Sequence, residues 1–240
     1  MENTRLILIP GAWSDASIWK LFVNELYNLG IESHSITLDG LNKEITEKHI
    51  DLETHIQNVV NFIETHKTDQ FYLVGHSYSG FVAYLAAERI PDKVVGLVFI
   101  EAFLPENNKS LLEVAGLDVA SETKSIEENN GWWPFPTKKE LQSQSYLSKD
   151  QIDYLVNSMM SHPGRTVTDK VQIHNDVLRS MPVYYIGGFL TKSIKTNSNF
   201  EKITFEKLDG GHWPMLTKPK ELATVLVEIL ISKRNKSSND

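Results

Sequence analysis

The chain has 240 residues, of which 41% are hydrophobic and 23% charged, proportions that are ordinary for a globular protein with one large core. Its formal net charge is −7 and it carries no dense basic block before its last residues, which argues against a nucleic-acid-binding face. It contains no cysteine, so disulfides, thiolate nucleophiles and cysteine-ligated metals are excluded. No apolar run reaches the length of a membrane-spanning helix, and we expect one cytoplasmic domain over residues 1–240 with no membrane partner.

Strand-like and helix-like segments alternate through the first hundred residues, a pattern typical of a parallel sheet covered by helices. Strands are expected over Leu6–Ile9, Ile31–Leu38, Phe71–Val74 and Val94–Ile100. Amphipathic helices are expected over Ala16–Leu29, from about Leu52 to Thr65, and over Phe81–Arg89.

The alternation stops at Pro105, and as far as Ser180 the chain is helical or irregular with no convincing strand. Within this segment, Thr137-x-x-Glu140 and Ser148-x-x-Gln151 have the form of capping boxes, each of which opens a short helix. We interpret residues 105–180 as a cap seated on the sheet and not as an independent domain.

The strand pattern resumes after the cap. Strands are expected over Val183–Ile186 and Ile203–Leu208, and a last helix from Pro219 to about Ile231. The polar residues from Lys233 to the end of the chain are expected to be disordered.

A serine stands where the third expected strand runs into a helix, in Gly75-His76-Ser77-Tyr78-Ser79-Gly80. This arrangement is typical of a nucleophile elbow, in which a strained serine exposes its hydroxyl above the sheet. The usual pattern is G-x-S-x-G, and here Ser79 takes the last position, with glycine one place later. A serine is small enough for that position, so Ser77 is the predicted nucleophile. The alternative is a plain tight turn with a surface serine.

A second glycine-flanked site, Gly210-Gly211-His212, follows the last expected strand. A neutral imidazole on such a loop can accept the serine proton, so His212 is the predicted general base. After the first strand, Pro10-Gly11-Ala12-Trp13 can supply a backbone N–H to an oxyanion, paired with the N–H of the residue after the nucleophile. The predicted oxyanion donors are therefore Ala12 and Tyr78. The other histidines show no metal-ligand spacing, and we expect neither a metal nor a cofactor.

Taken together, these motifs resemble the α/β-hydrolase superfamily, in particular its small esterases near the plant methyl-salicylate esterase and hydroxynitrile lyase branch. The matching segments stand in the family's order: Pro10–Trp13, Gly75–Tyr78, Glu101-Ala102-Phe103-Leu104-Pro105, Ser161-His162-Pro163 and Gly210–His212. The resemblance implies an α/β-hydrolase fold, with a mostly parallel sheet of about six strands flanked by helices and a helical cap over the pocket.

The acid of the predicted triad departs from the family pattern. Relatives carry an aspartate on the loop after the strand Val183–Ile186, and alignment places Thr191 there. Glu101, at the end of the fourth strand, is the predicted substitute, because open α/β sheets place active sites at the carboxyl ends of strands and the order Ser…acid…His is preserved. We expect Glu101 to orient His212. The alternatives are a Ser–His dyad with a neutral partner and a Glu101 that only caps an element.

The predicted function is hydrolysis of a small, largely apolar carboxylic ester or lactone through an acyl-serine intermediate. Trp13, Trp133 and Trp213 are expected to line the substrate pocket. A lyase reaction is an alternative, although the lyase branch carries lysine and threonine where Trp213 and Gly11 stand. A slow-turnover ligand receptor built on the same fold is another. The oligomeric state stays open between a monomer and a homodimer.

Overall fold

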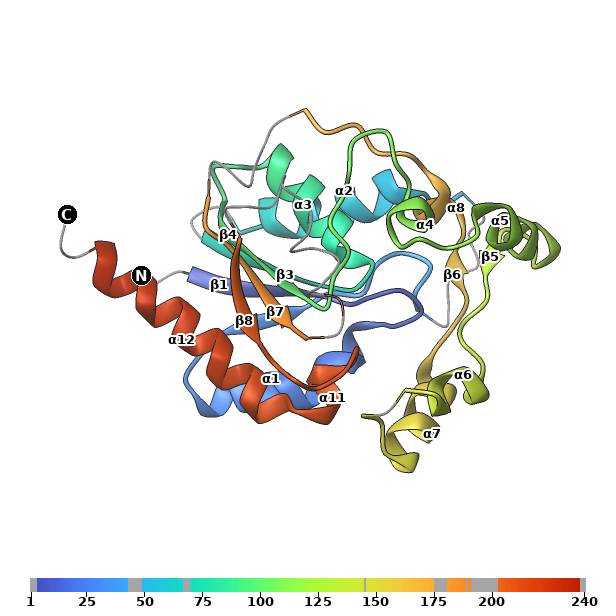
Figure 1. The fold of residues 1–240 in the computed structure, drawn as a ribbon. Helices are drawn as coiled ribbons and strands as arrows, with labels where there is room; N and C mark the ends of the chain where they lie inside the picture. The colour runs from blue at the N-terminus through green and yellow to red at the C-terminus, as the bar shows by residue number, and fades with distance from the viewer. Residues whose placement is uncertain are drawn as a thin grey trace.

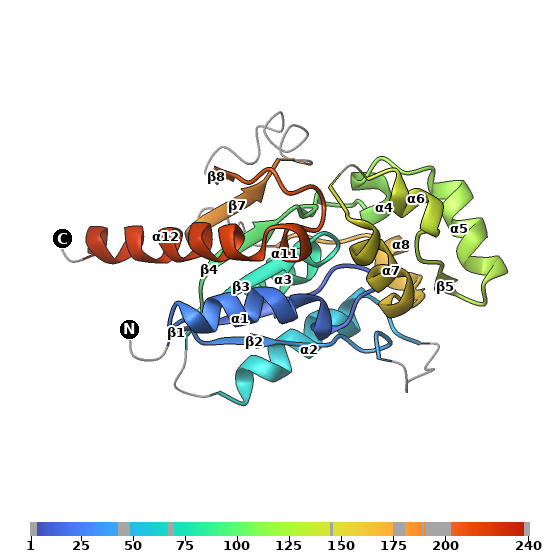
Figure 2. The ribbon, with the colours of Figure 1, turned by 90° about the horizontal axis from the view of Figure 1, so that it is seen from below.

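The computed structural model describes residues 4–42, 49–66, 70–144, 146–174, 181–188, 190 and 203–237. These residues form a central sheet with helices on both faces and a group of short elements beyond the carboxyl ends of the strands (Figures 1 and 2). None of the helices described is long and apolar enough to cross a membrane.

The described sheet has six strands in the order β2-β1-β3-β4-β7-β8, and every neighbouring pair is parallel. The strands are β1 (Thr4–Ile9), β2 (Ser33–Ser35), β3 (Gln70–His76), β4 (Val94–Ile100), β7 (Val183–Gly187) and β8 (Thr204–Lys207). The predicted fold class, a mostly parallel sheet of about six strands flanked by helices, is confirmed. The strand predicted over Ile31–Leu38 is much shorter, because β2 is an edge strand that pairs with β1 at only three positions.

Two helical layers bury the two faces of the sheet. Along β3, Phe71 and Leu73 pack on the side of α2 (Leu52–Glu64) and α3 (Ser79–Arg89). The alternate residues Tyr72 and Val74 pack on the other side, against α1 (Lys20–Asn28) and α12 (Pro219–Ser237). Figure 2 shows α1 and α12 lying along one face of the sheet. The apolar strands therefore form a core that is closed on both faces, as parallel sheets require.

The helix boundaries differ from the predicted ones at both ends of the chain. A short 3-10 helix, η1 (Ala16–Trp19), precedes α1, and a four-residue helix, α11 (Pro214–Thr217), precedes α12. The predicted disorder from Lys233 is wrong as far as Ser237, because α12 continues that far. The sequence over these positions contains neither glycine nor proline, the residues that most readily end a helix.

The segment between β4 and β7 holds the two expected short helices, α6 (Lys138–Gln142) and α7 (Lys149–Ser158), and further helices that were not individually predicted. The further helices are α4 (Leu111–Val114), α5 (Val119–Glu128) and α8 (Arg165–Thr168). Both predicted capping boxes are present, at the starts of α6 and α7. The expectation of no strand was wrong in one detail, because β5 (Trp132–Trp133) pairs antiparallel with β6 (His162–Pro163). This small ribbon brings His162 next to the loop that follows β1.

Candidate active site

The backbone at Ser77 has the strained conformation expected of a nucleophile elbow. Ser77 directly follows β3 and has φ = 53°, in the left-handed region that non-glycine residues avoid at a cost of about 1–2 kcal/mol. Hydrogen bonds hold it there: its N–H donates to Ile100 at 3.3 Å, and its C=O accepts from Phe103 at 3.0 Å. The serine is therefore fixed at the carboxyl edge of the sheet.

The displaced glycine of the motif has a steric reason. A Cβ on Gly80 would lie 2.1 Å from the carbonyl oxygen of Phe103, whereas Ser79 fits without exposure to solvent. The Ser79 hydroxyl donates a hydrogen bond to the carbonyl oxygen of Pro10. In this chain glycine is required at position 80, and the serine before it ties the elbow to the loop after β1.

The imidazole of His212 lies within hydrogen-bond distance of the elbow serine. Its Nε2 atom is 3.0 Å from Ser77 Oγ. Burial lowers the pKa of His212 to about 4, so the ring is neutral near pH 7 and can accept a proton. The preceding Gly211 has φ = 68°, and a Cβ there would lie 2.8 Å from the ring of Tyr146. Glycine is therefore needed before His212 for two reasons: the backbone has a positive φ there, and the ring of Tyr146 leaves no space for a side chain.

His76 supports the loop that carries His212. Its Nε2–H donates to the backbone carbonyl oxygen of His212 at 2.8 Å, and the centroids of the two rings are 4.9 Å apart. Trp213 packs against the His76 ring at 5.2 Å and is only 3% exposed. The residue before the predicted nucleophile thus contacts the backbone of the predicted base.

Glu101 is a buried carboxylate built into the end of the sheet. It directly follows β4, which pairs with β3, and it has φ = 43°. Its two carboxylate oxygens accept the backbone N–H groups of Gly188 at 2.6 Å and Leu190 at 2.8 Å. A Cβ on Gly187 would lie 2.5 Å from Glu101 Oε1, so β7 has to end in glycine beside this carboxylate. Thr191, the residue aligned with the family's aspartate, lies outside the described residues.

One predicted oxyanion donor, Tyr78, lies in the elbow, and the other, Ala12, lies in the loop that follows β1. Ala12 and Tyr78 are both buried, and no hydrogen bond among the described residues uses either backbone N–H. A Cβ on Gly11 would lie 2.7 Å from His76 Nδ1 and 3.0 Å from Ser77 Cβ, so the loop after β1 packs directly on the elbow. Two amides that no hydrogen bond among the described residues uses therefore lie in the elbow and in the loop packed on it.

The three predicted substrate-binding tryptophans lie in two separate places. Trp13 and Trp133 pack on each other with ring centroids 4.3 Å apart, where the cap meets the loop after β1. Trp213 is buried in the layer that holds α1 and α12. Contact of all three with substrate stays a prediction.

Two cap residues bind the segment around His212. The Tyr146 hydroxyl donates to Asp209 Oδ1 at 2.6 Å, and Gln151 Nε2 donates to the carbonyl oxygen of Leu216 at 2.8 Å. The cap is thereby attached to the chain on both sides of the predicted base.

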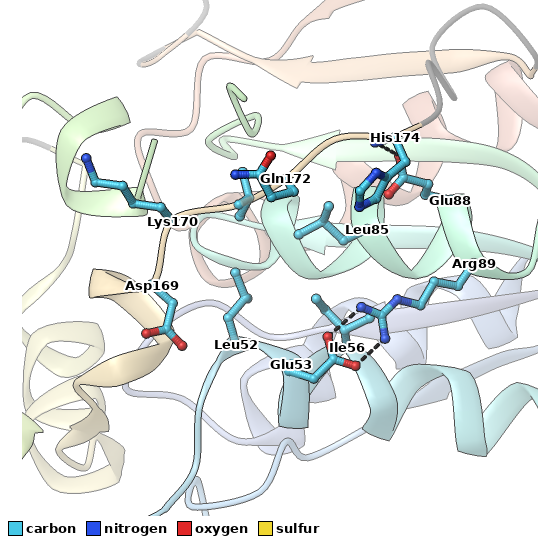
Figure 3. Close-up of a pocket in the computed structure, with 11 residues that line it drawn as sticks. Leu52, Glu53, Ile56, Leu85, Glu88, Arg89, Asp169, Lys170, Gln172 and His174 are labelled. Carbon is cyan, nitrogen blue, oxygen red and sulfur yellow. Dashed lines mark hydrogen bonds and ion pairs between the residues drawn. The ribbon is translucent and has the colours of Figure 1, made fainter. Parts of the chain in front are cut away.

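A separate hollow of about 370 Å³ lies between α2, α3 and residues 169–174 (Figure 3). The Arg89 guanidinium at its edge is paired with Glu53, and Lys170 with Glu113 at 3.0 Å. None of the predicted catalytic residues lines this hollow, and its basic side chains are already neutralised by carboxylates. We assign the candidate site to the elbow and not to this hollow.

Sequence reasoning missed two buried histidines beside the site. His55 and His162 have no solvent exposure, and the His55 ring Nδ1 accepts a hydrogen bond from the Tyr78 hydroxyl at 2.8 Å. The only sequence signal for either was the Ser161-His162-Pro163 segment, which entered through the resemblance. Periodicity did not single out His55, which lies on a helix with several polar residues.

The chain is similar to known proteins in both sequence and fold. A model of the alpha/beta hydrolase family matches residues 6–225. The chain is 34% identical over 108 residues to the carbendazim hydrolyzing esterase of Nocardioides sp. (strain SG-4G), an alignment covering 44% of this chain and 45% of that protein. It is 22% identical over 261 residues to the putative chloroplastic methylesterase 15 of Arabidopsis thaliana, covering 99% of this chain and 59% of that protein. The chain thus spans less than two thirds of the length of either relative.

Among solved structures, the chain is similar to an extracellular alpha/beta-hydrolase from a Paenibacillus species, described as sharing structural and functional homology with tobacco salicylic acid binding protein 2. The TM-score is 0.81 at 21% identity, and the match covers 94% of this chain and 98% of that one. This likeness shows the fold.

Proposed function

This chain belongs to the alpha/beta hydrolase family, and we propose that it is a serine esterase that cleaves a small, largely apolar carboxylic ester or lactone. The observation that carries the proposal is the 3.0 Å separation between His212 Nε2 and Ser77 Oγ at an elbow with positive φ. A nucleophile within hydrogen-bond reach of a neutral base is the signature of covalent acyl transfer. The esterase names of the two curated relatives favour the same reaction.

The proposed reaction has two stages, acylation of Ser77 and hydrolysis of the acyl-serine. Neutral His212 takes the hydroxyl proton of Ser77 while Oγ attacks the ester carbonyl, and the carbonyl oxygen becomes an oxyanion that accepts the N–H groups of Ala12 and Tyr78. The tetrahedral intermediate collapses, and the His212 imidazolium gives its proton to the departing alcohol. Water then attacks the acyl-serine with His212 again as base, which releases the acid and restores Ser77.

Glu101 is the proposed acid that orients His212 and stabilises its imidazolium. The proposal is supported by its complete burial and its place after β4, which pairs with β3, the strand that directly precedes Ser77. Its left-handed backbone conformation and the two backbone N–H groups that its oxygens accept hold the carboxylate in one place at the carboxyl edge of the sheet. A Ser–His dyad is the competing arrangement, and substitution of Glu101 distinguishes the two.

The proposed substrate is small and weakly polar. Trp13 and Trp133 meet beside the loop that carries Ala12, and aromatic side chains near a few polar groups suit an uncharged ligand. Ester hydrolysis is favoured over the lyase reaction because the residue after His212 is Trp213, which is buried against His76 and brings no positive charge to the site.

The test is multiple turnover of p-nitrophenyl acetate, butyrate and octanoate by the purified protein. We expect Ser77→Ala to reduce kcat by at least about 10⁴-fold. Ser121→Ala, which changes an exposed serine of α5, serves as the control and leaves kcat unchanged. Turnover that survives Ser77→Ala would refute the nucleophile, and stoichiometric binding without turnover would favour the receptor.

A further inference from the structure

One buried imidazole of the cap contacts both halves of the proposed oxyanion hole. His162 has no solvent exposure, and its Nδ1 accepts the backbone N–H of Trp13 at 3.3 Å. The same ring meets the ring of Tyr78 edge-on, with centroids 4.7 Å apart. Trp13 directly follows Ala12, and Tyr78 carries the other proposed donor amide, so His162 contacts the loop of one donor and the side chain of the other.

The loop after β1 depends on the cap for its conformation. Trp13 has φ = 64°, a left-handed backbone conformation that costs a non-glycine residue about 1–2 kcal/mol. Such a conformation persists only where surrounding contacts hold it in place. Three hydrogen bonds from the cap do so: the N–H bond to His162, the Trp13 C=O accepting from Met160 at 3.0 Å, and the indole N–H donating to the Trp133 carbonyl at 3.3 Å. The peptide that follows Ala12 is thereby fixed, and this restrains the direction of the Ala12 amide.

The other half of the hole is held by the same cluster. The Tyr78 hydroxyl donates to His55 Nδ1, and His55 Nε2–H donates to the carbonyl oxygen of Asp39, each at 2.8 Å. The centroids of the His55 and His162 rings are 5.6 Å apart. Burial raises the pKa of Tyr78 and lowers that of His162, so the phenol stays a donor and the imidazole stays a neutral acceptor.

We propose that His162 is a positioning residue that holds the Ala12 and Tyr78 amides in the geometry that stabilises the oxyanion. This inference rests on the proposed esterase function and assigns the cap a part in the chemistry beyond covering the pocket. Because the oxyanion exists only after attack, loss of His162 should lower kcat with little change in KM.

The test compares His162→Leu, which removes the acceptor, with His162→Asn, whose Oδ1 stands in place of Nδ1. Removing a whole oxyanion donor lowers kcat by about 10²–10³-fold. Because His162→Leu should only misplace a donor, we expect its kcat to fall by about 10–100-fold, with KM within about twofold of the wild-type value. We expect His162→Asn to regain most of the loss. Inhibition by an aryl trifluoromethyl ketone, which forms an oxyanion on Ser77, should weaken in parallel with kcat/KM.

Leu141→Ala is the control, because it removes a buried side chain of the cap that packs in the core with α1 and α12, whereas Tyr78 and Trp133 beside His162 belong to the other core. It should lower stability without a selective loss of kcat. Equal kcat in His162→Leu and wild type would overturn the proposal, as would losses of equal size in the Leu and Asn variants.

Two NMR readouts separate this proposal from the proposed function. Ring ¹⁵N spectra should show His162 protonated on Nε2 alone, and the Trp13 amide should exchange with solvent faster in His162→Leu than in wild type. A proton on Nδ1, or equal exchange rates, would refute the positioning role even in an active enzyme. Absence of Ser77-dependent turnover would refute the esterase proposal and with it the catalytic part of this inference, while these readouts still decide whether His162 holds the loop.

Discussion

His76 donates a hydrogen bond from Nε2 to the backbone carbonyl oxygen of His212 at 2.8 Å. The contact joins the last residue of β3, which precedes the proposed nucleophile, to the loop that carries the proposed base, 136 residues later in the chain. On its other side, the His76 ring packs so close to Gly11 that no side chain fits between them. One imidazole thus sets the spacing of the elbow, the loop after β1 and the loop that carries His212.

Substitution of His76 should separate this support from simple packing. His76→Leu leaves the partly buried His212 carbonyl without its donor, at a cost of about 1–3 kcal/mol, and lets His212 move. We expect kcat to fall by at least about tenfold. His76→Gln can donate from its amide nitrogen and should keep more of both activity and stability. Ester kinetics and thermal unfolding check this, and equal effects of the two substitutions would contradict it.

Substitution of Glu101 tests the proposed acid. Glu101→Gln keeps the shape of the side chain but cannot stabilise an imidazolium, and its NH₂ faces a backbone donor. We expect kcat to fall by about 10²–10⁴-fold, with unfolding easier by about 1–3 kcal/mol. Steady-state kinetics and urea unfolding are the measurements. A folded variant with near-wild-type turnover would favour the dyad.

Gly187 offers a test of the same carboxylate from the opposite side. Gly187→Ala places a Cβ 2.5 Å from Glu101 Oε1 and should displace the carboxylate, lowering kcat at least about tenfold. Gly188→Ala is the matched control, because its nearest contact is the Leu208 carbonyl oxygen at 3.3 Å. If both alanine variants had the same kcat, the predicted link between Gly187 and Glu101 would be wrong.

The pH dependence of activity should follow the protonation of His212. Its pKa is lowered to about 4 by burial, and only the neutral ring accepts the Ser77 proton. Activity should therefore be full at pH 6–7 and be lost as the pH falls through about 4. A profile of kcat/KM against pH with a neutral ester checks this. A midpoint near 6.5, the usual histidine pKa, would contradict it.

The pH dependence of stability should report His55. Burial lowers its pKa from 6.5 to about 4 in the folded chain. As the pH falls, His55 therefore takes up its proton in the unfolded chain before it does so in the folded chain. The stability that neutral His55 contributes is full above pH 6.5 and is lost as the pH falls toward 4. The slope is about 1.4 kcal/mol per pH unit for one proton.

His55→Asn isolates this contribution, because its amide oxygen can still accept from Tyr78 but does not titrate. We expect urea unfolding at pH 7, 6 and 5 to show that the unfolding free energy of this variant depends less steeply on pH than that of wild type, by the uptake of about one proton. Identical slopes would mean that His55 is not buried in its neutral form.

Features that depend on neighbours in the chain were predictable from the sequence. The capping boxes at Thr137 and Ser148 formed as expected, because the hydrogen bonds of a capping box join residues only three apart. The alternation of apolar segments predicted the parallel sheet, and the strand over Val94–Ile100 has the expected bounds. The glycine-flanked Ser77 indicated an elbow, and the structure shows the positive φ that an elbow requires.

Features that depend on distant partners were decided only by the tertiary structure. Nothing near His162 in the chain indicates that its imidazole accepts a hydrogen bond from Trp13, 149 residues earlier. Similarly, no local pattern indicates that Gly187 is a glycine because the Glu101 carboxylate occupies the place of its side chain. Periodicity and capping are encoded over a few residues, whereas burial and the choice of hydrogen-bond partner arise when the sheet, the loops at its carboxyl edge and the cap pack together.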